Sequence, residues 1–368
     1  MTIVGTRPEL IKLSRVIAVL DSCVDHTLVH TGQNYDYGLN GVFFKEMKIR
    51  EPDYYLNAAA KNPSETLSNV IKFTDRLLVK IKPDAVLVLG DTNSCLAVYP
   101  AKRRKIPIFH MEAGNRCFDF RVPEEINRRI IDHISDINMV YTEHARRYLL
   151  DEGLPPDQII KTGSPMKEIL TYHQDNIDSS DIVSRLNLQT KKYFVVSIHR
   201  EENVDDSSNL ENLIRAINII EMKYRYPVIF SCHPRTKSRL ETGKLAISDN
   251  VQVMAPLGFF DYICLQKNAY CVISDSGTLT EESSLLGFPA VTIRQSHERP
   301  EGMDEGIVVM AGVHSEDILH ATALTIKQLQ SYGLSKIVLD YDVPQISWKV
   351  AKIILSYINF VNQRVWHK

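Results

Sequence analysis

The sequence predicts an α/β protein made of two doubly wound, Rossmann-like domains that face each other across a cleft. Short β-branched runs alternate with helical patterns along the whole chain, which is typical of βαβ units and parallel sheets. The 368 residues exceed the length of one such domain. Apolar residues make up 44% and charged residues 24%, as in ordinary globular proteins.

The first half opens with apolar runs that are typical of buried parallel strands. A stripe of apolar residues at helical spacing, from Leu10 to Leu20, follows the first run. Further helices are predicted over residues 64–81 and 127–137. The strands predicted here cover residues 2–4, 26–30, 85–89, 107–111 and 138–141.

A boundary between domains is predicted near residue 166, because Gly163, Ser164 and Pro165 break the alternation. Residues 1–166 then form the first domain and residues 167–344 the second. The C-terminal helix, within 345–368, is expected to pack back on the first domain. The second domain is predicted to contain strands over 193–198, 227–231, 251–254, 271–274 and 290–294, and helices over 209–223, 278–286 and 315–330.

Composition excludes several classes of protein. A net charge of −2 gives no reason to expect nucleic acid or an anionic membrane as a partner. The six cysteines are scattered, which argues against a zinc site and a disulfide scaffold and suits a reducing compartment. No apolar run approaches the ~18 residues of a membrane span, so we expect a cytoplasmic protein.

Two motifs of the first half follow predicted strands. In GTRPELIK, Gly5 permits a tight turn, and Arg7 with the free amides of a helix N-terminus suits an anion. A plain turn explains this motif equally well. In LGDTNS, Asp91 lies at the carboxyl end of a strand, where α/β proteins bind ligands. Its simpler explanation is an N-cap of the next helix.

The stretch FHMEAGNRCFDFRVPEEINRR carries the strongest candidates of this half. Glu112 follows a strand, and it lies at the same sheet edge as Asp91 if the two strands are neighbours. A buried carboxylate at a strand end is costly unless it is paired. Glu124 and Glu125 fall in the first turn of a helix, where the dipole stabilises them without any functional role. Arg128 is expected either to contact substrate or to neutralise these carboxylates.

Two motifs of the second half also follow strands. His199, with Arg200 beside it, favours an anionic or proton-transfer role. In ISDSGTLTEESS, the turn at Ser276, Gly277 and Thr278 precedes a helix whose amides suit a diphosphate. Glu282 lies about a turn further on and suits ribose hydroxyls. A capping box explains the same residues. Residues 340–342 spell DYD, but we expect a solvated connection there and no metal site.

Taken in order, GTRPE, HTGQ, LGDTNS, HMEAGNR, PEEINRR, HREEN, DSGTLTEE and IRQSHERPEGM resemble the non-hydrolysing UDP-N-acetylglucosamine 2-epimerase family over nearly the whole chain. The motifs look most similar to the UDP-N-acetyl-L-fucosamine synthase branch. The resemblance implies a GT-B-like fold, a UDP-linked acetamido sugar as ligand, a homodimer, and no cofactor or metal requirement.

The resemblance also implies roles for individual residues. Proton transfer falls on Asp91, Glu112 and Glu124, and contact with the leaving phosphate falls on His199. Contacts with the UDP-sugar fall on Arg7, Lys12, Ser276, Gly277, Glu282 and Arg299. From their positions in the sequence, Arg128 and Thr278 are also expected to contact it.

This sequence departs from the common epimerases at several positions. Thr278 replaces a second glycine and Thr280 replaces glutamine. Asn34 and Tyr35 replace a His-Arg-type pair in a region linked to activation by UDP-N-acetylglucosamine. These departures argue against that activation and favour a different sugar.

We therefore predict inversion at C2 of a UDP-2-acetamido-2,6-dideoxy-L-hexose, from talo to fuco, giving UDP-N-acetyl-L-fucosamine for bacterial surface polysaccharide. The expected route eliminates UDP to a 2-acetamidoglycal and adds it back. The first alternative is the UDP-N-acetylglucosamine/UDP-N-acetylmannosamine epimerase. A GT-B glycosyltransferase and a non-catalytic nucleotide-sugar sensor are further alternatives, and the set of three carboxylates argues against both.

Overall fold

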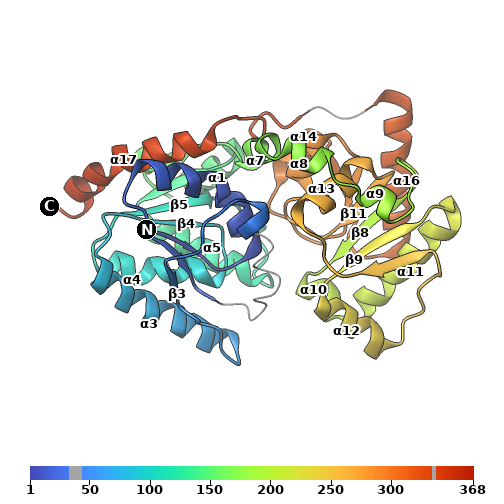
Figure 1. Cartoon of the computed structure of the whole chain (residues 1–368), viewed down its shortest axis with the longest axis horizontal. Coiled ribbons are helices and arrows are strands. Elements are labelled where there is room, and N and C mark those ends of the chain that lie inside the picture. The colour runs from blue at the N-terminus through green and yellow to red at the C-terminus, as the bar shows by residue number, and fades with distance from the viewer. Residues whose placement is uncertain (33–43, 334–336) are drawn as a thin grey trace. The chain divides into compact units, whose positions relative to one another are not determined.

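The computed structural model describes residues 1–32, 44–333 and 337–368 (Figure 1). These residues form two compact units. The first unit contains Met1–Thr171 and Leu339–Lys368, and the second contains Tyr172–Val338. Each unit is built on its own parallel sheet, so the predicted α/β class with two such sheets is confirmed.

The first sheet has the strand order β3-β2-β1-β4-β5-β6-β7, and all its pairs are parallel. The order reverses between β1 and β4, which pair through Thr2 and Leu87. Ligands of doubly wound sheets bind beyond the carboxyl ends of the strands at such a switch point. The strands are β1 (Thr2–Val4), β2 (Leu28–His30), β3 (Tyr54–Tyr55), β4 (Val86–Leu89), β5 (Ile108–Ala113), β6 (Ile137–Val140) and β7 (Ile159–Lys161).

Helices of the first unit begin at residues suited to a helix start. Asn62, for example, accepts a hydrogen bond from the Glu65 amide and is followed by Pro63. The long α17 lies along α1, so the end of the chain returns to this unit (Figure 1). The α-helices are α1 (Arg7–Cys23), α3 (Pro63–Ile81), α4 (Val98–Arg103), α5 (Pro123–Ile134), α6 (Glu143–Asp151), α7 (Met166–Tyr172) and α17 (Ile346–Val365), with short 3-10 turns η1 (Asn93–Ala97) and η2 (Pro156–Gln158).

The second sheet has the order β10-β9-β8-β11-β12-β13 and is also parallel throughout. Its order reverses between β8 and β11, which pair from Phe194 and Cys271 onward. The segments after these two strands therefore flank the second switch point. The strands are β8 (Phe194–Ile198), β9 (Val228–Cys232), β10 (Val251–Met254), β11 (Cys271–Ser274), β12 (Ala290–Thr292) and β13 (Val308–Met310).

Two helices of the second unit, α11 and α12, begin with a side chain that caps the helix. The Asp206 side chain, for example, accepts a hydrogen bond from the Asn209 amide at the start of α11. The helices are α8 (Gln174–Asp178), α9 (Ile182–Arg185), α10 (Glu201–Val204), α11 (Ser207–Tyr224), α12 (Pro234–Gly243), α13 (Phe259–Asn268), α14 (Leu279–Leu286), α15 (Pro300–Asp304) and α16 (Ser315–Tyr332).

Two expectations from the sequence are corrected. The helix predicted over 127–137 is α5, which starts and ends earlier, because Ser135 has extended backbone and Ile137 begins β6. The structure also contains the strands β3, β7 and β13, which were not predicted.

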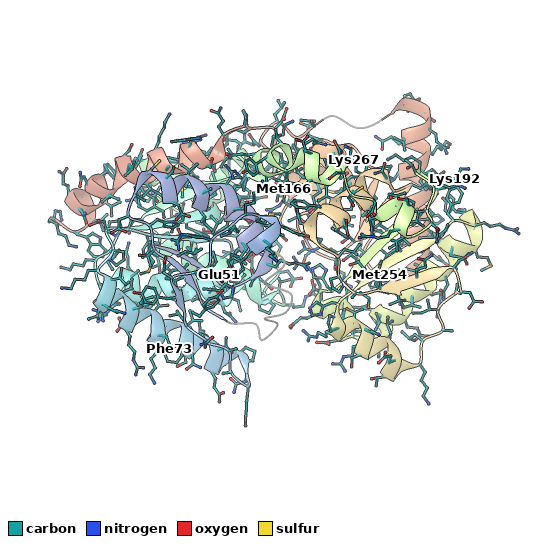
Figure 2. All side chains as sticks on the ribbon, in the orientation of Figure 1. Glu51, Phe73, Met166, Lys192, Met254 and Lys267 are labelled. Carbon is teal, nitrogen blue, oxygen red and sulfur yellow. The ribbon has the colours of Figure 1, made fainter. Side chains whose placement is uncertain are left out.

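Apolar side chains pack against the sheets to form the cores, and Figure 2 adds the side chains to the ribbon. Phe73 of α3 packs on the first sheet's core, and Phe230 of β9 belongs to the core of the second sheet. Among residues 1–32, 44–333 and 337–368, every helix is too short or too polar to cross a membrane.

Candidate active site

The turn after β1 packs closely against the segment after β4. A Cβ on Gly5 would lie 1.9 Å from Ser94 Oγ and 2.1 Å from Thr31 Oγ1, so glycine is required for this approach. Arg7 is the first residue of α1 and is half-buried. The turn thus places a guanidinium and a helix N-terminus at the first switch point.

Glu112 has an unusual backbone conformation. Its φ of +61° lies in the left-handed region, and the pairing of β5 with β6 shifts between Met111 and Ala113. A non-glycine residue in this region costs ~1–2 kcal/mol, and such bulges re-aim side chains near active sites. The Glu112 carboxylate lies 2.7 Å from Lys12 Nζ, with these side chains 13% and 5% exposed. The predicted buried carboxylate is therefore paired.

Asp91 pairs with Arg128 of α5 rather than capping a helix. Arg128 Nη2 lies 2.8 Å from an Asp91 carboxylate oxygen, and Arg128 Nε donates to the same oxygen at 3.1 Å. The residue that caps η1 is Thr92, whose hydroxyl oxygen accepts from the Ser94 amide. The N-cap explanation for Asp91 is therefore wrong.

The start of α5 packs on this Asp91 segment. Asn127 donates to the Asp91 carbonyl oxygen at 2.9 Å. Glu124 precedes Asn127 by three residues and Arg128 by four, so all three share a helix face. Glu124 is half-buried. Glu125 is fully buried and accepts from the Cys117 amide at 3.0 Å, which fits a structural role.

A buried polar network contacts the residue before Asp91, and no motif in the sequence indicates it. His110 Nε2 lies 2.8 Å from the Gly90 carbonyl oxygen, and its Nδ1 lies 2.9 Å from Asp132. Arg116 donates to Asp132 at 2.6 Å. Burial alone would raise the pKa of Asp132, but His110 and Arg116 lower it below its usual value. This network fixes the peptide that precedes Asp91.

In the second unit, His199 is held by a buried aspartate. Asp275 accepts from the amides of His199 and Arg200, each at 3.0 Å, and its other oxygen lies 2.8 Å from His199 Nδ1. Burial would raise the pKa of Asp275, but these partners lower it to about 2. The His199 side chain remains 45% exposed, so its orientation is fixed while its outer ring edge stays accessible.

The turn from Ser276 to Thr278 leads into α14. A Cβ on Gly277 would lie 2.9 Å from a Glu298 carboxylate oxygen, so a side chain at this position would require Glu298 to shift. Thr278 is the N-cap residue, but its side chain makes no cap hydrogen bond. The capping-box explanation is therefore wrong for this turn, and the helix N-terminus with its partial positive charge suits an anion.

The remaining two candidates of this unit are buried. Arg299 is 3% exposed and donates to Glu281 at 3.1 Å. The Glu282 carboxylate accepts a hydrogen bond from the side-chain amide of Gln266 at 2.9 Å. Both side chains are thus anchored by neighbours on α14 or α13.

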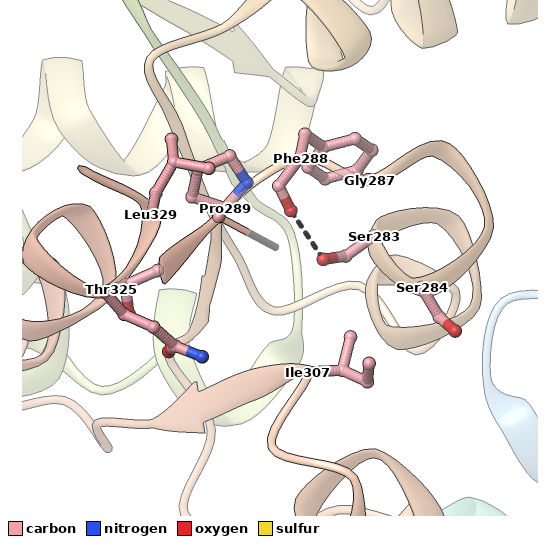
Figure 3. Close-up of a pocket in the computed structure, with 10 residues that line it drawn as sticks. Ser283, Ser284, Gly287, Phe288, Pro289, Ile307, Thr325 and Leu329 are labelled. Atoms are coloured by element: carbon pink, nitrogen blue, oxygen red, sulfur yellow. Dashed lines mark hydrogen bonds between the residues drawn. The ribbon is translucent and has the colours of Figure 1, made fainter. Parts of the chain in front are cut away.

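A small pocket lies at the other end of α14, away from the Ser276 turn (Figure 3). It is lined by residues that include Ser283, Gly287 and Ile307, and its volume is about 30 Å³. That space accommodates one or two waters rather than a nucleotide. The described residues contain no cluster of three metal-ligating side chains. Asp340 and Asp342 of the DYD sequence pair with Lys161 and Lys167.

Two Rossmann-like units with charged side chains at both switch points are typical of the class of protein that binds nucleotide-linked ligands. The family model described as UDP-N-acetylglucosamine 2-epimerase matches residues 20–355. The chain belongs to the UDP-N-acetylglucosamine 2-epimerase family, and it is a UDP-sugar 2-epimerase, an isomerase that inverts C2.

Individual relatives agree with this assignment. The UDP-N-acetylglucosamine 2-epimerase of Methanococcus maripaludis is 36% identical over 88% of this chain and 91% of its own length. The structure of UDP-N-acetylglucosamine 2-epimerase from Rickettsia bellii is 50% identical, with a TM-score of 0.93 over 100% of this chain and 99% of that one. The Methanocaldococcus jannaschii enzyme in complex with UDP-GlcNAc and UDP is 32% identical, with a TM-score of 0.90 over 96% of this chain and 99% of that one.

These relatives correct one expectation. They are UDP-N-acetylglucosamine 2-epimerases, so they support the first alternative better than the fucosamine synthase branch. The GT-B-like fold is confirmed, since the glycosyltransferase of kitacinnamycin is 10% identical and matches with a TM-score of 0.57 over 97% of this chain and 98% of that one. Asn34 and Tyr35, on which the branch expectation partly depended, lie outside the described residues.

Proposed function

We propose that this enzyme interconverts UDP-N-acetylglucosamine and UDP-N-acetylmannosamine. The names of its relatives and the crystallised complex of the Methanocaldococcus jannaschii enzyme support this substrate. The observation in this chain that best supports the chemistry is the position of Glu112. Its carboxylate extends from a left-handed bulge and lies at the same sheet edge as Asp91.

The proposed reaction begins with cleavage of the bond between C1 and the UDP oxygen. The C2 proton is not acidified by a carbonyl, but positive character at C1 makes it labile. A carboxylate accepts that proton, and the products are a 2-acetamidoglycal and UDP. Delivery of a proton to the opposite face of C2 and return of UDP to C1 give the epimer. Two faces need two proton-handling groups.

We assign these groups to the first unit. Asp91 and Glu112 are the proposed proton-transfer pair, and Glu124 assists or orients them from the first turn of α5. Each member of the pair is held by a cation, Arg128 for Asp91 and Lys12 for Glu112. A carboxylate fixed in this way loses little freedom before it meets the substrate.

We propose that the residues expected to contact UDP bind it and stabilise its departure. Arg7 supplies a cation at the first switch point, while His199, Arg299 and the turn at Ser276 supply donors for the diphosphate. Such donors stabilise the charge that develops on the leaving group. Glu282 is proposed to accept hydrogen bonds from the ribose.

A second candidate substrate is the UDP-2-acetamido-2,6-dideoxy-L-hexose. Thr278 and Thr280 favour it, because they replace glycine and glutamine of the common epimerases in a turn proposed to face the ligand. Both threonines lie at or just inside the start of α14.

One experiment distinguishes these substrates. Each UDP-sugar is incubated with the enzyme in D₂O and C2 is followed by NMR. Deuterium at C2 of UDP-N-acetylglucosamine, together with the manno epimer, supports the proposal. Turnover of the 6-deoxy-L-sugar alone would transfer the assignment to the second candidate, and no exchange with either would refute both.

We also propose a cytoplasmic homodimer that serves surface polysaccharide synthesis. All six cysteines are free thiols, which suits a reducing compartment. For the dimer, Phe118 and Phe120 are 62% and 64% exposed and precede α5, whose Ile126 and Ile130 are also exposed. An apolar surface of this kind is typical of interfaces. Ile126→Lys should then lower the mass measured by light scattering to that of one chain.

A further inference from the structure

Glu9 is a buried carboxylate that joins the two loops of the first switch point. One of its oxygens accepts from the Gly5 amide at 2.5 Å and from the Thr6 amide at 3.1 Å. Its other oxygen is hydrogen-bonded to the Thr92 hydroxyl. Thr92 directly follows Asp91, so a single side chain links the turn of Arg7 to the turn of Asp91.

A capping role accounts for two of these three contacts. Glu9 is the third residue of α1, and its bonds to the start of the helix are those of a capping box. The contact with Thr92 reaches across 83 positions of sequence. Capping glutamates are ordinarily exposed, whereas Glu9 is only 2% exposed.

The ionisable neighbours of Glu9 come from two segments. Its own helix carries Arg7 at the first position and Lys12, which is engaged with Glu112. The segment after β4 carries Asp91 and the Cys95 thiol, which lies 3.9 Å from Glu9. Burial, with a smaller contribution from Asp91, raises the pKa of Glu9 to about 7, against the lowering effect of Thr92 and the two amides. Glu9 thus exists in both protonation states near neutral pH.

The two states differ in the direction of one hydrogen bond. Ionised Glu9 can only accept, so the Thr92 hydroxyl must donate to it. Protonated Glu9 donates to Thr92 instead, and the Thr92 hydrogen is released. Thr92 is half-buried and still accepts from the Ser94 amide in either state.

We propose that Glu9 is a positioning residue that ties the Arg7 turn to the Asp91 turn, and that its proton decides whether Thr92 donates to Glu9 or into the site. Ionised Glu9 forms charge-assisted bonds to three donors and holds the two turns more firmly. Activity should therefore rise as the pH increases through 7. The kinetic part of this inference rests on the proposed C2 epimerisation.

The test compares pH profiles of kcat/KM for UDP-N-acetylglucosamine between pH 5.5 and 8.5. The wild-type value should rise about fivefold through pH 7, the factor expected when a charge-assisted hydrogen bond replaces a neutral one. Glu9→Gln mimics the protonated acid, since its amide nitrogen donates to Thr92. This variant should show the low-pH activity of the wild type and no rise.

Two more variants exclude a merely structural role. Thr92→Val removes the hydroxyl and should also lose the rise in kcat/KM. Asp136→Asn is the matched control, because Asp136 is another buried carboxylate whose burial raises its pKa, and it binds the Ile108 amide at the opposite end of β5. That variant should keep the wild-type profile.

Ionisation is measured separately by ¹³C NMR of carboxyl-labelled glutamate. The wild-type protein should show one glutamate that titrates near pH 7, and Glu9→Gln should lack it. In Thr92→Val the same glutamate should titrate at a higher pH, because the Thr92 hydroxyl lowers the pKa of Glu9. Absence of that titration in the wild type, or an unchanged kinetic rise in Glu9→Gln or Thr92→Val, would overturn the inference. An enzyme that inverts neither sugar would refute the proposed function instead, and the NMR titration would still decide whether Glu9 ionises there.

Discussion

The Lys12–Glu112 ion pair allows a quantitative test of the site's construction. We consider Lys12→Met, Glu112→Gln and the double variant. Breaking a buried pair from one side leaves an uncompensated charge and costs ~3–5 kcal/mol. Because these side chains are 5% and 13% exposed, we take the lower end, ~3 kcal/mol for each single variant.

The double variant should be much less affected, since both charges are gone. We expect it to lose ~1 kcal/mol, and hence a coupling free energy of ~5 kcal/mol. Gln at position 112 has the same strained backbone as Glu, so the strain cancels when the single and double variants are compared in the double-mutant cycle. In a unit of about 200 residues, 3 kcal/mol corresponds to a fall in Tm of ~6–12 °C.

Urea unfolding followed by tryptophan fluorescence suits this unit. The chain has two tryptophans, Trp348 in α17 and Trp366 directly after it, and both belong to the first unit. The control pair is Lys167–Asp342, which has a similar distance of 2.9 Å but is 37% exposed on both sides. Its coupling should be ~0–1 kcal/mol. Equal coupling in the two pairs would refute the claim that Glu112 is held as a buried, paired carboxylate.

Three further predictions concern the site residues. Asp91→Asn should lower kcat by ~10²–10⁴ while calorimetry shows UDP affinity within about twofold of wild type; near-full activity would exclude Asp91 as an acid/base group. Arg299→Ala should weaken UDP binding by at least ~10-fold, and an unchanged Kd would exclude Arg299 from the nucleotide site. Asp275 has a pKa of about 2, below its value of about 4 in the unfolded chain, so it stabilises the fold above pH 4 and loses this effect as the pH falls toward 2. Asp275→Asn should reduce the fall in the free energy of unfolding between pH 4 and pH 2, measured by urea unfolding followed by circular dichroism. It should also lower kcat, because His199 loses the carboxylate that orients it. An unchanged fall in the variant would contradict the assignment.

Local sequence is sufficient for much of the fold. The strands β4, β8 and β11 have four or five residues, two or three of them β-branched, and site candidates follow each of them within two residues. Because parallel strands end at one sheet edge, the sequence alone places Asp91 and Glu112 together. The short strands β3, β7 and β13 carry no such signal.

The features that escape prediction depend on partners distant in sequence. Asp91 resembles a helix cap because its partner Arg128 lies 37 residues later. Glu9 has the pattern of a capping glutamate until the fold brings Thr92 beside it. The bulge at Glu112 has no glycine at the left-handed position, so the sequence does not indicate it. Asp275 and its hydrogen-bond partner His199 lie 76 residues apart. Tertiary contacts, rather than local propensity, create these parts of the site.

The most direct test of the account is solvent deuterium incorporation at C2 of UDP-N-acetylglucosamine by wild-type enzyme and Glu112→Gln. We predict that the wild type labels C2 as the manno epimer forms. Glu112→Gln should label it at least ~100-fold more slowly, with UDP affinity within about twofold of wild type. Labelling by Glu112→Gln at the wild-type rate would contradict the assignment of Glu112 to proton transfer.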